Sequence, residues 1–316
     1  MSPVLLGKTS PTFPSSQGDF ILQSCDKVNF YVWKLMLQLS SAVFGDMFEL
    51  APKVAPRDYS TSEESSIRAR RRSRHSSRSL QILAPLPHAE SVPVHGLSPP
   101  FVEVSEDAVT LEALLSFIHP NAPRPTFNSL DVLISTLRAA QKYAMDQVVF
   151  TLGSELVRSR VIDGKVVPSF ADTDPLRVFA VTRELGLQAE SQIAAVATLN
   201  VNLNSAAASA EVDRMPTMFY REVLRLRKER KDWVKAHKWW TISMHQPGQT
   251  SHCPCGTRHR DIPDSVKQTI LKAPTSATIR NLDLAASFPC LRCQGAARRH
   301  FANMAAAYDE YFSITL

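Results

Sequence analysis

Glycine is scarce in this sequence, and the motifs of several common enzyme classes are missing. Only 10 of the 316 residues are glycine, against 21 prolines. This balance argues against the glycine-rich turns of nucleotide-binding α/β folds and favours helices separated by proline-marked breaks. The sequence contains no G-x-S-x-G, H-E-x-x-H or G-x-G-x-x-G. We therefore expect a protein that is not an enzyme and that holds no organic cofactor.

A long apolar run is also missing. The longest uncharged stretch, residues 191–210, is broken by Asn200, Asn202 and Asn204, so we do not expect a membrane span or a membrane partner. The first residues carry a short apolar patch at positions 4–6 with no cationic region before it, which is not typical of a signal peptide. We expect an intracellular protein of the nucleus or the cytoplasm.

Cysteine is uncommon, and its placement predicts one metal site. Apart from Cys25, the cysteines lie late in the chain, at Cys253, Cys255, Cys290 and Cys293. The C-x-x-C spacing of the last two suits a tetrahedral zinc ion. The first two are closer together than is usual, so His252 or His259 is an alternative ligand. We expect one structural zinc; the alternative is four reduced thiols beside apolar helices.

Positive charge is concentrated in separate segments. The net charge of +6 contains +4 from residues 60–80 and +6 from residues 214–238, while Arg292, Arg298 and Arg299 add three more. The remainder of the chain is mildly acidic. Any contact with a polyanion is therefore expected at these basic segments.

Residues 19–48 follow the pattern of a hairpin leading into two helices. A short apolar run at 20–22 and a polar turn at 24–27 precede residues 28–33, which alternate at the period of a half-buried strand. Leu35 and Leu39 then lie four apart, and a second helical pattern follows Ser41, which is placed to cap it.

This order, with V-x-K-x-x-L-x-L-x-S-x-x-F-x-x-M-F, resembles the opening of BTB/POZ domains, especially those of fungi. Residues 101–107 are similar to that family's third strand and acidic turn. Residues 110–120 are similar to its L-x-x-L-L-x-F-I-x-P helix, and residues 139–145 to its A-x-K-Y-x-M helix. Trp33 departs from the pattern, because the family usually has a histidine there.

The resemblance implies a fold, a class of function and two site residues. BTB domains generally form dimers and dock partner proteins, including as adaptors for cullin-type ubiquitin ligases and as transcriptional regulators. In relatives linked to zinc fingers, an acidic residue on the first strand and a basic residue after the second form a charged pocket at the dimer. The matching positions here are Asp19 and Lys34. The resemblance does not identify the partner protein.

The chain is expected to be α+β and mostly helical, in four parts. Residues 1–17 contain three prolines and are predicted to be a disordered leader. Residues 18–150 are the BTB/POZ-like domain, interrupted at 51–98 by a Ser- and Arg-rich insertion predicted to be disordered. Residues 151–205 resemble the helical extension that often follows fungal BTB domains. Residues 206–316 are a basic helical region containing the zinc candidates.

The insertion has two interpretations. Its arginines between positions 68 and 78 are typical of a nuclear-import signal or a polyanion contact, and Ser73, Ser76 and Ser77 are candidate phosphorylation sites. The alternative is a solvated segment without a dedicated partner.

Helical periodicity returns in the second half of the chain. One apolar face is predicted over 130–143, and a loop over 162–172. Helices follow from Pro175 to a stop at Gly186, and over 188–199 with Ile193, Val196 and Ala197 turned inward.

A longer basic helix is predicted between residues 216 and 240, followed by a last helix over 296–312. The apolar stripe of the longer helix is interrupted by Arg230 and consists of Phe219, Val223, Leu226, Trp233 and Trp240. This helix either contacts a partner with an acidic surface or is docked by its tryptophans with a solvated basic face.

The leading hypothesis is thus a non-enzymatic interaction protein with a BTB-like domain, protein partners and a homodimeric state. The alternative is a nucleic-acid-associated regulator that uses the basic segments and the zinc site. An arginine-rich loop by itself supplies salt-sensitive attraction to phosphates and no readout of base sequence.

Overall fold

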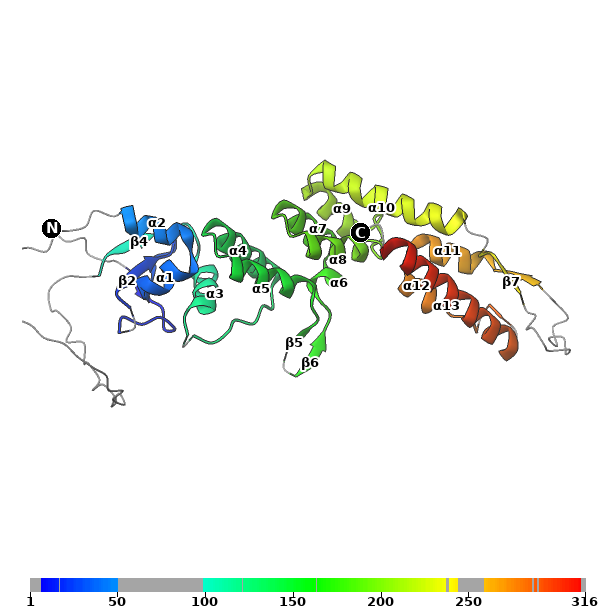
Figure 1. Ribbon diagram of the computed structural model, residues 1–316, viewed down its shortest axis with the longest axis horizontal. Helices are drawn as coiled ribbons and strands as arrows, with labels where there is room; N and C mark the ends of the chain where they lie inside the picture. Colours follow the sequence, from blue (N-terminus) through cyan, green and yellow to red (C-terminus); the bar gives the residue numbers. More distant parts are fainter. Residues whose placement is uncertain are drawn as a thin grey trace, which may run out of the picture. The chain divides into compact units, whose positions relative to one another are not determined.

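The chain divides into two compact units, Met1–Ser105 and Glu106–Leu316 (Figure 1). In this computed structural model the described residues are 7–16, 18–50, 99–120, 122–162, 164–236, 239–243, 259–285, 287–288 and 290–313. They form 13 helices and a small mixed four-stranded sheet near the N-terminus, which confirms the mostly helical α+β class. The expected insertion at residues 51–98, with its three candidate serines, lies outside the described residues.

The N-terminal unit is built on a sheet with strand order β1-β3-β2-β4. β2 (Phe20–Gln23) and β3 (Val28–Val32) form the predicted antiparallel hairpin, in which Phe20 pairs with Val32. Lys27 has a φ of +64°, the left-handed conformation favoured in tight turns. β4 (Phe101–Glu103) lies parallel to β2, and β1 (Lys8–Thr9) lies parallel to β3.

Residues 7–16 differ from the disordered leader that the prolines predict. They run beside β3, where the Ser10 N–H donates to the Asn29 carbonyl at 2.9 Å. Phe13 is fully buried, and its ring centre lies 5.8 Å from that of Phe30. β1 is an edge strand, so Pro11 removes no donor that a neighbouring strand needs. Strand pairing and burial of one aromatic ring therefore order this segment.

Two helices complete the described part of this unit, α1 (Lys34–Ser40) and α2 (Ala42–Leu50). The predicted cap is confirmed, because the Ser41 hydroxyl accepts the Phe44 N–H at 3.1 Å. Phe44 and Leu37 enter the core. Leu35 and Leu39, whose spacing predicts the first helix, remain outside it, since a helix of seven residues presents only one narrow face to the sheet.

The second unit begins with α3 (Ala108–Ile118), α4 (Leu130–Lys142) and α5 (Asp146–Val157), each packed against the next. The Asp107 carboxylate accepts the Thr110 N–H at 2.8 Å and caps α3. Ser129 caps α4 in the same way. The predicted apolar face of α4 is confirmed, because its five members are buried: Leu130, Leu133, Ile134, Leu137 and Ala140.

The predicted loop over 162–172 contains regular structure. β5 (Arg160–Ile162) and β6 (Lys165–Val167) form a hairpin around Gly164, whose φ of +74° suits glycine. Ser169 and Asp172 form a capping box on α6 (Phe170–Thr173). Val161 and Val166 face each other across the hairpin but are 65% and 77% exposed. Because these paired valines are not buried, the sequence has no pattern of a buried strand face from which the hairpin could be predicted.

Three helices follow this hairpin. α7 (Pro175–Glu184) starts at its proline and ends before Gly186, which has a φ of +72°, as predicted. α8 (Gln188–Thr198) also matches its prediction, but Ile193 is 51% exposed while Ala194 is fully buried. The inward prediction for Ile193 is wrong because α8 turns its small side chains toward α7. α9 (Ala206–Arg214) is capped by Ser205.

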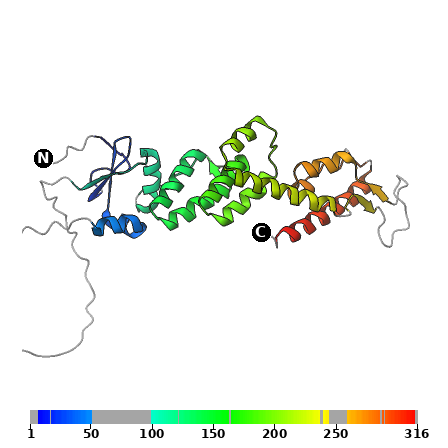
Figure 2. The same ribbon diagram turned by 90° about the horizontal axis from the view of Figure 1, so that it is seen from above.

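The long helix α10 (Thr217–Ala236) runs from the green helices α7–α9 to the orange and red helices in both Figure 1 and Figure 2. Its end packs with a hairpin, β7 (Thr241–Ser243) and β8 (His259–Asp261), and with α11 (Asp264–Lys272), α12 (Ser276–Arg280) and α13 (Leu291–Ser313). Trp233 of α10 and Phe301 of α13 share one apolar core, here called the C-terminal core. The predicted basic helix and last helix are both confirmed.

Among the described residues, no helix combines the length and the apolar character that crossing a bilayer requires.

Candidate functional site

Asp19 and Lys34, the pair implied by the resemblance, lie next to each other in the N-terminal unit. The backbone N–H of Lys34 donates to the Asp19 carboxylate at 2.7 Å, in the first turn of α1. The Asp19 N–H in turn donates to the Val32 carbonyl at 3.2 Å, which fixes Asp19 beside the end of β3. The carboxylate therefore caps α1, and a negative charge at this helix end is favourable.

The Lys34 ammonium has different partners. It lies 4.9 Å from the centre of the Phe48 ring and 5.8 Å from that of Phe20, within cation–π range of both. These two rings meet edge to face at 4.9 Å. The structure thus brings Asp19 and Lys34 together through the backbone, while the lysine charge is held over an aromatic pair.

Several large apolar side chains close to this pair in the sequence are exposed. Leu35 and Leu39 are 62% and 75% exposed, and their spacing of four places them on the same side of α1. Trp33 before the helix and Val43 in the first turn of α2 are 45% and 43% exposed. We call these four residues the α1 face. Exposed large apolar side chains are frequent in protein-binding sites.

In the second unit, Glu106 belongs to a polar cluster that joins the start of α3 to the end of α4. Its carboxylate accepts bonds from the Lys142 ammonium at 2.7 Å and from the Tyr143 hydroxyl at 2.5 Å. Burial raises the pKa of Glu106, but these bonds outweigh it, so the pKa lies below its ordinary value. Burial and the bond to Glu106 raise the pKa of Tyr143. This arrangement holds two helices together.

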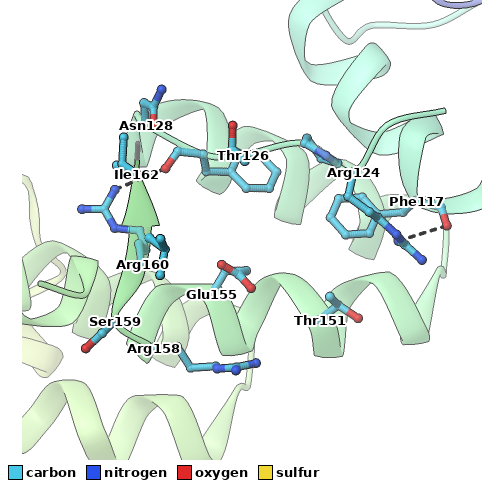
Figure 3. Close-up of a pocket in the computed structure, with 13 residues that line it drawn as sticks. Phe117, Arg124, Thr126, Asn128, Thr151, Glu155, Arg158, Ser159, Arg160 and Ile162 are labelled. Carbon is cyan, nitrogen blue, oxygen red and sulfur yellow. Dashed lines mark hydrogen bonds between the residues drawn. The ribbon is translucent and has the colours of Figure 1, made fainter. Parts of the chain in front are cut away.

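A hollow of about 450 Å³ lies between the loop before α4, the end of α5 and β5 (Figure 3). Two arginines at its rim bind backbone carbonyls: Arg160 donates to Phe127 at 3.2 Å, and Arg124 donates to Phe117 at 3.4 Å. In Figure 3 the Glu155 side chain rises from α5 toward the loop. The arginines therefore serve to fasten the loop and the hairpin.

The structure describes two of the proposed zinc ligands. Cys290 precedes α13 and Cys293 lies in its first turn, where the Cys293 N–H donates to the Cys290 sulfur at 3.4 Å. Cys293 is fully buried in the C-terminal core and Cys290 is half-buried. The side chains of the other candidates lie outside the described part of the chain: Cys253, Cys255, His252 and His259.

The strands on either side of the first cysteine segment in the sequence are described. β7 and β8 pair with each other, and β7 lies against α13. Within the described residues, no three His, Cys, Asp or Glu side chains are grouped to hold a metal. The zinc site stays a prediction.

Arg227 of α10 is a core residue that the sequence did not reveal. It is 9% exposed, and its guanidinium donates to the carbonyls of Thr198, at 2.6 Å, and of Val201. These bonds fasten α10 to the end of α8 and to the loop that follows. Burial lowers the pKa of Arg227, but a guanidinium stays protonated in proteins.

Arg230, one turn later, is 3% exposed. Its guanidinium lies 3.3 Å from the centre of the Phe312 ring and 5.3 Å from that of Tyr308. The position does not interrupt the buried stripe of α10; it belongs to it, because an arginine stacked on aromatic rings can replace an apolar residue there. Its helical spacing between Leu226 and Trp233 was the signal that could have identified it.

Comparison with protein-family models, curated proteins and solved structures finds no match to this chain.

Proposed function

We propose that this chain is a non-enzymatic protein–protein interaction module of the BTB/POZ type, which self-associates and docks partner proteins through the α1 face. The observation that carries the proposal is the exposure of Trp33, Leu35, Leu39 and Val43 beside Leu37, which is fully buried. Exposure of apolar area to water is unfavourable. Covering that area with a second protein surface therefore lowers the free energy.

The cap made by Asp19 supports the same proposal. It fixes the start of α1, and with it the direction in which Leu35 and Leu39 project. A preformed surface loses less conformational entropy on binding than a mobile one. The resemblance implies a role such as an adaptor for a cullin-type ubiquitin ligase or a transcriptional regulator, and it leaves the partner protein to be identified by experiment.

Light scattering of the full chain at high micromolar concentration tests self-association. We expect a mass of twice the 35.1 kDa chain. A Leu35→Glu, Leu39→Glu double variant should return to the mass of one chain, because a carboxylate buried in an apolar interface without a partner is strongly unfavourable. A monomer mass for the wild type at all concentrations would remove self-association from the proposal.

A matched control tests whether the effect is specific to the α1 face or follows from placing a charge on any exposed apolar residue. Ile193→Glu changes another exposed apolar residue, 51% exposed on α8, and should leave the mass unchanged. Partner docking is tested by affinity purification with mass spectrometry. Proteins retained by the wild type and lost by the double variant are partners of the α1 face, and an identical set from both would contradict the proposal.

The nucleic-acid alternative has less support. Two of the nine basic residues between positions 214 and 238, Arg227 and Arg230, are buried, so they add little to the exposed basic surface that a nucleic-acid strand would contact. Binding of DNA or RNA would show as a linear fall of log affinity with log salt concentration, and its absence at low salt would dismiss the alternative.

A further inference from the structure

A hollow of about 700 Å³ lies on the second unit, between the loop that joins α8 to α9, the middle of α10 and the end of α11. Its volume is within the range of small-molecule sites, roughly 300–1,000 Å³. Asn200 and Asn202 come from the loop, and Thr269 from α11. The two asparagine amides carry N–H donors, whereas the Thr269 hydroxyl already donates to the Ser265 carbonyl at 2.9 Å. The hollow therefore offers the asparagine amides as neutral hydrogen-bond donors as well as space.

Four lysines line this hollow. Lys228, Lys231 and Lys235 follow one side of α10 at spacings of three and four, which spans about 10 Å along the helix axis. Lys272 comes from the last turn of α11. Asp232 is the one acidic residue of the lining. With Arg227, which also lines the hollow, five cations face one acidic residue, so the lining carries an excess of four positive charges.

These lysines have no counter-ions in the described part of the chain. None of them takes part in an ion pair there, whereas arginines elsewhere in the unit do, such as Arg138 with Glu184 and Arg183 with Glu222. Like charges held around one hollow repel each other, and a bound anion would remove that repulsion.

The walls of the hollow are held in place. The buried guanidinium of Arg227, on α10, donates to the carbonyls of Thr198 and Val201. It therefore fixes the loop that joins α8 to α9 against the helix. This loop carries Asn200 and Asn202. The same guanidinium adds a permanent positive charge close to the hollow, since it is also part of the lining.

We propose that this hollow binds a small molecule that carries two or more phosphate groups. Phosphate matches the site because lysine is a compact, flexible point charge that pairs with phosphate oxygens, and several lysines require several negative charges. A small ligand fits better than a nucleic acid strand, because the cations converge on one concave site from two helices. This site is independent of the α1 face.

Isothermal titration of the full chain with inorganic tripolyphosphate tests the proposal. We expect saturable binding of one tripolyphosphate per chain at physiological ionic strength. A Lys231→Gln, Lys272→Gln double variant should raise Kd by about tenfold or more, since it removes one charge from each helix. Because neither side chain has an ion-pair or hydrogen-bond partner among the described residues, the melting temperature should stay near that of the wild type.

Lys165→Gln is the matched control. Lys165 lies on β6, is exposed and forms no ion pair with a described residue, so its loss should leave Kd within about twofold. Absence of tripolyphosphate binding, or an equal loss in the control, would overturn the proposal. So would binding of a single-stranded oligonucleotide or an acidic peptide that tripolyphosphate does not displace.

Discussion

Replacing Arg230 tests how a charged residue stabilises the C-terminal core. The side chain is 3% exposed, its guanidinium stacks on Phe312 at 3.3 Å, and it interacts with the Tyr308 hydroxyl. Its Nε has no partner within the described structure. Asp309, the nearest acidic residue on α13, is instead paired with Arg280. Arg230 is therefore a buried cation held by aromatic rings.

Two effects of opposite sign determine the result of a substitution. Arg230→Ala removes a cation–π contact worth about 2 kcal/mol when desolvated, together with the packing of the aliphatic stem, so we expect a loss of about 3 kcal/mol. Arg230→Met keeps an unbranched side chain over Phe312 and removes the cost of burying a charge. We expect its stability to lie within about 1 kcal/mol of the wild type.

Urea unfolding followed by tryptophan fluorescence measures both variants. Three of the four tryptophans, Trp233, Trp239 and Trp240, belong to the C-terminal core or pack against it, so fluorescence reports mainly on this region. Arg225→Ala is the control on the same helix, because Arg225 is exposed and its pair with Glu229 spans 3.8 Å. We expect a change below about 0.5 kcal/mol for it.

The comparison of the Met and Ala variants tests whether Arg230 stabilises the core by its packing or by its charge. If Met is as damaging as Ala, the guanidinium itself supplies most of the stabilisation and the packing argument is refuted. If Ala is as stable as the wild type, the side chain does not contribute to the core at all.

Three further outcomes are expected. Asp19→Ala should destabilise the N-terminal unit by about 1 kcal/mol while Asp19→Asn, which keeps an acceptor for the Lys34 N–H, costs less in urea unfolding. Burial raises the pKa of Tyr308 to about 12, above its ordinary value near 10, although Arg230 opposes the shift; stability should therefore fall as the pH rises from 10 to 12. Tyr308→Phe should reduce that fall in pH-dependent melting, while the contribution of Tyr143, whose pKa is also raised, remains. Elemental analysis of protein purified without added metal should find one zinc per chain, and a Cys290→Ser, Cys293→Ser variant should lack it; a metal-free wild type would contradict the zinc site.

Much of the fold could be predicted from local signals. Four features each depend on a few adjacent residues whose spacing is sufficient to predict them. They are the hairpin before α1, the Ser41 cap, the buried face of α4 and the glycine stop after α7. The same holds for α10 and α13. These elements were recognised because their own sequence contains the periodicity and the end signals.

The remaining features depend on partners distant in sequence. Residues 7–16 lie beside β3, and no pattern within their own sequence predicts this pairing. The inward face of α8 is made of small residues, so Ile193 misled a prediction based on size. Asp19 and Lys34 could be named from the resemblance, but their contact through the Lys34 backbone depends on how β2 and α1 meet.

In helix α10, the formal charge counted from the sequence differs from the charge that is exposed to a binding partner. Residues 214–238 carry a formal charge of +6, yet two of the cations of the helix are buried. Arg227 and Arg230 are buried, one against carbonyls and one against aromatic rings, because a guanidinium is planar and weakly hydrated. The lysines at 228, 231 and 235 line the open hollow instead, since an ammonium is strongly hydrated. Arg227 and Arg230 therefore belong to the scaffold, and the three lysines form part of the surface that is accessible to an anion.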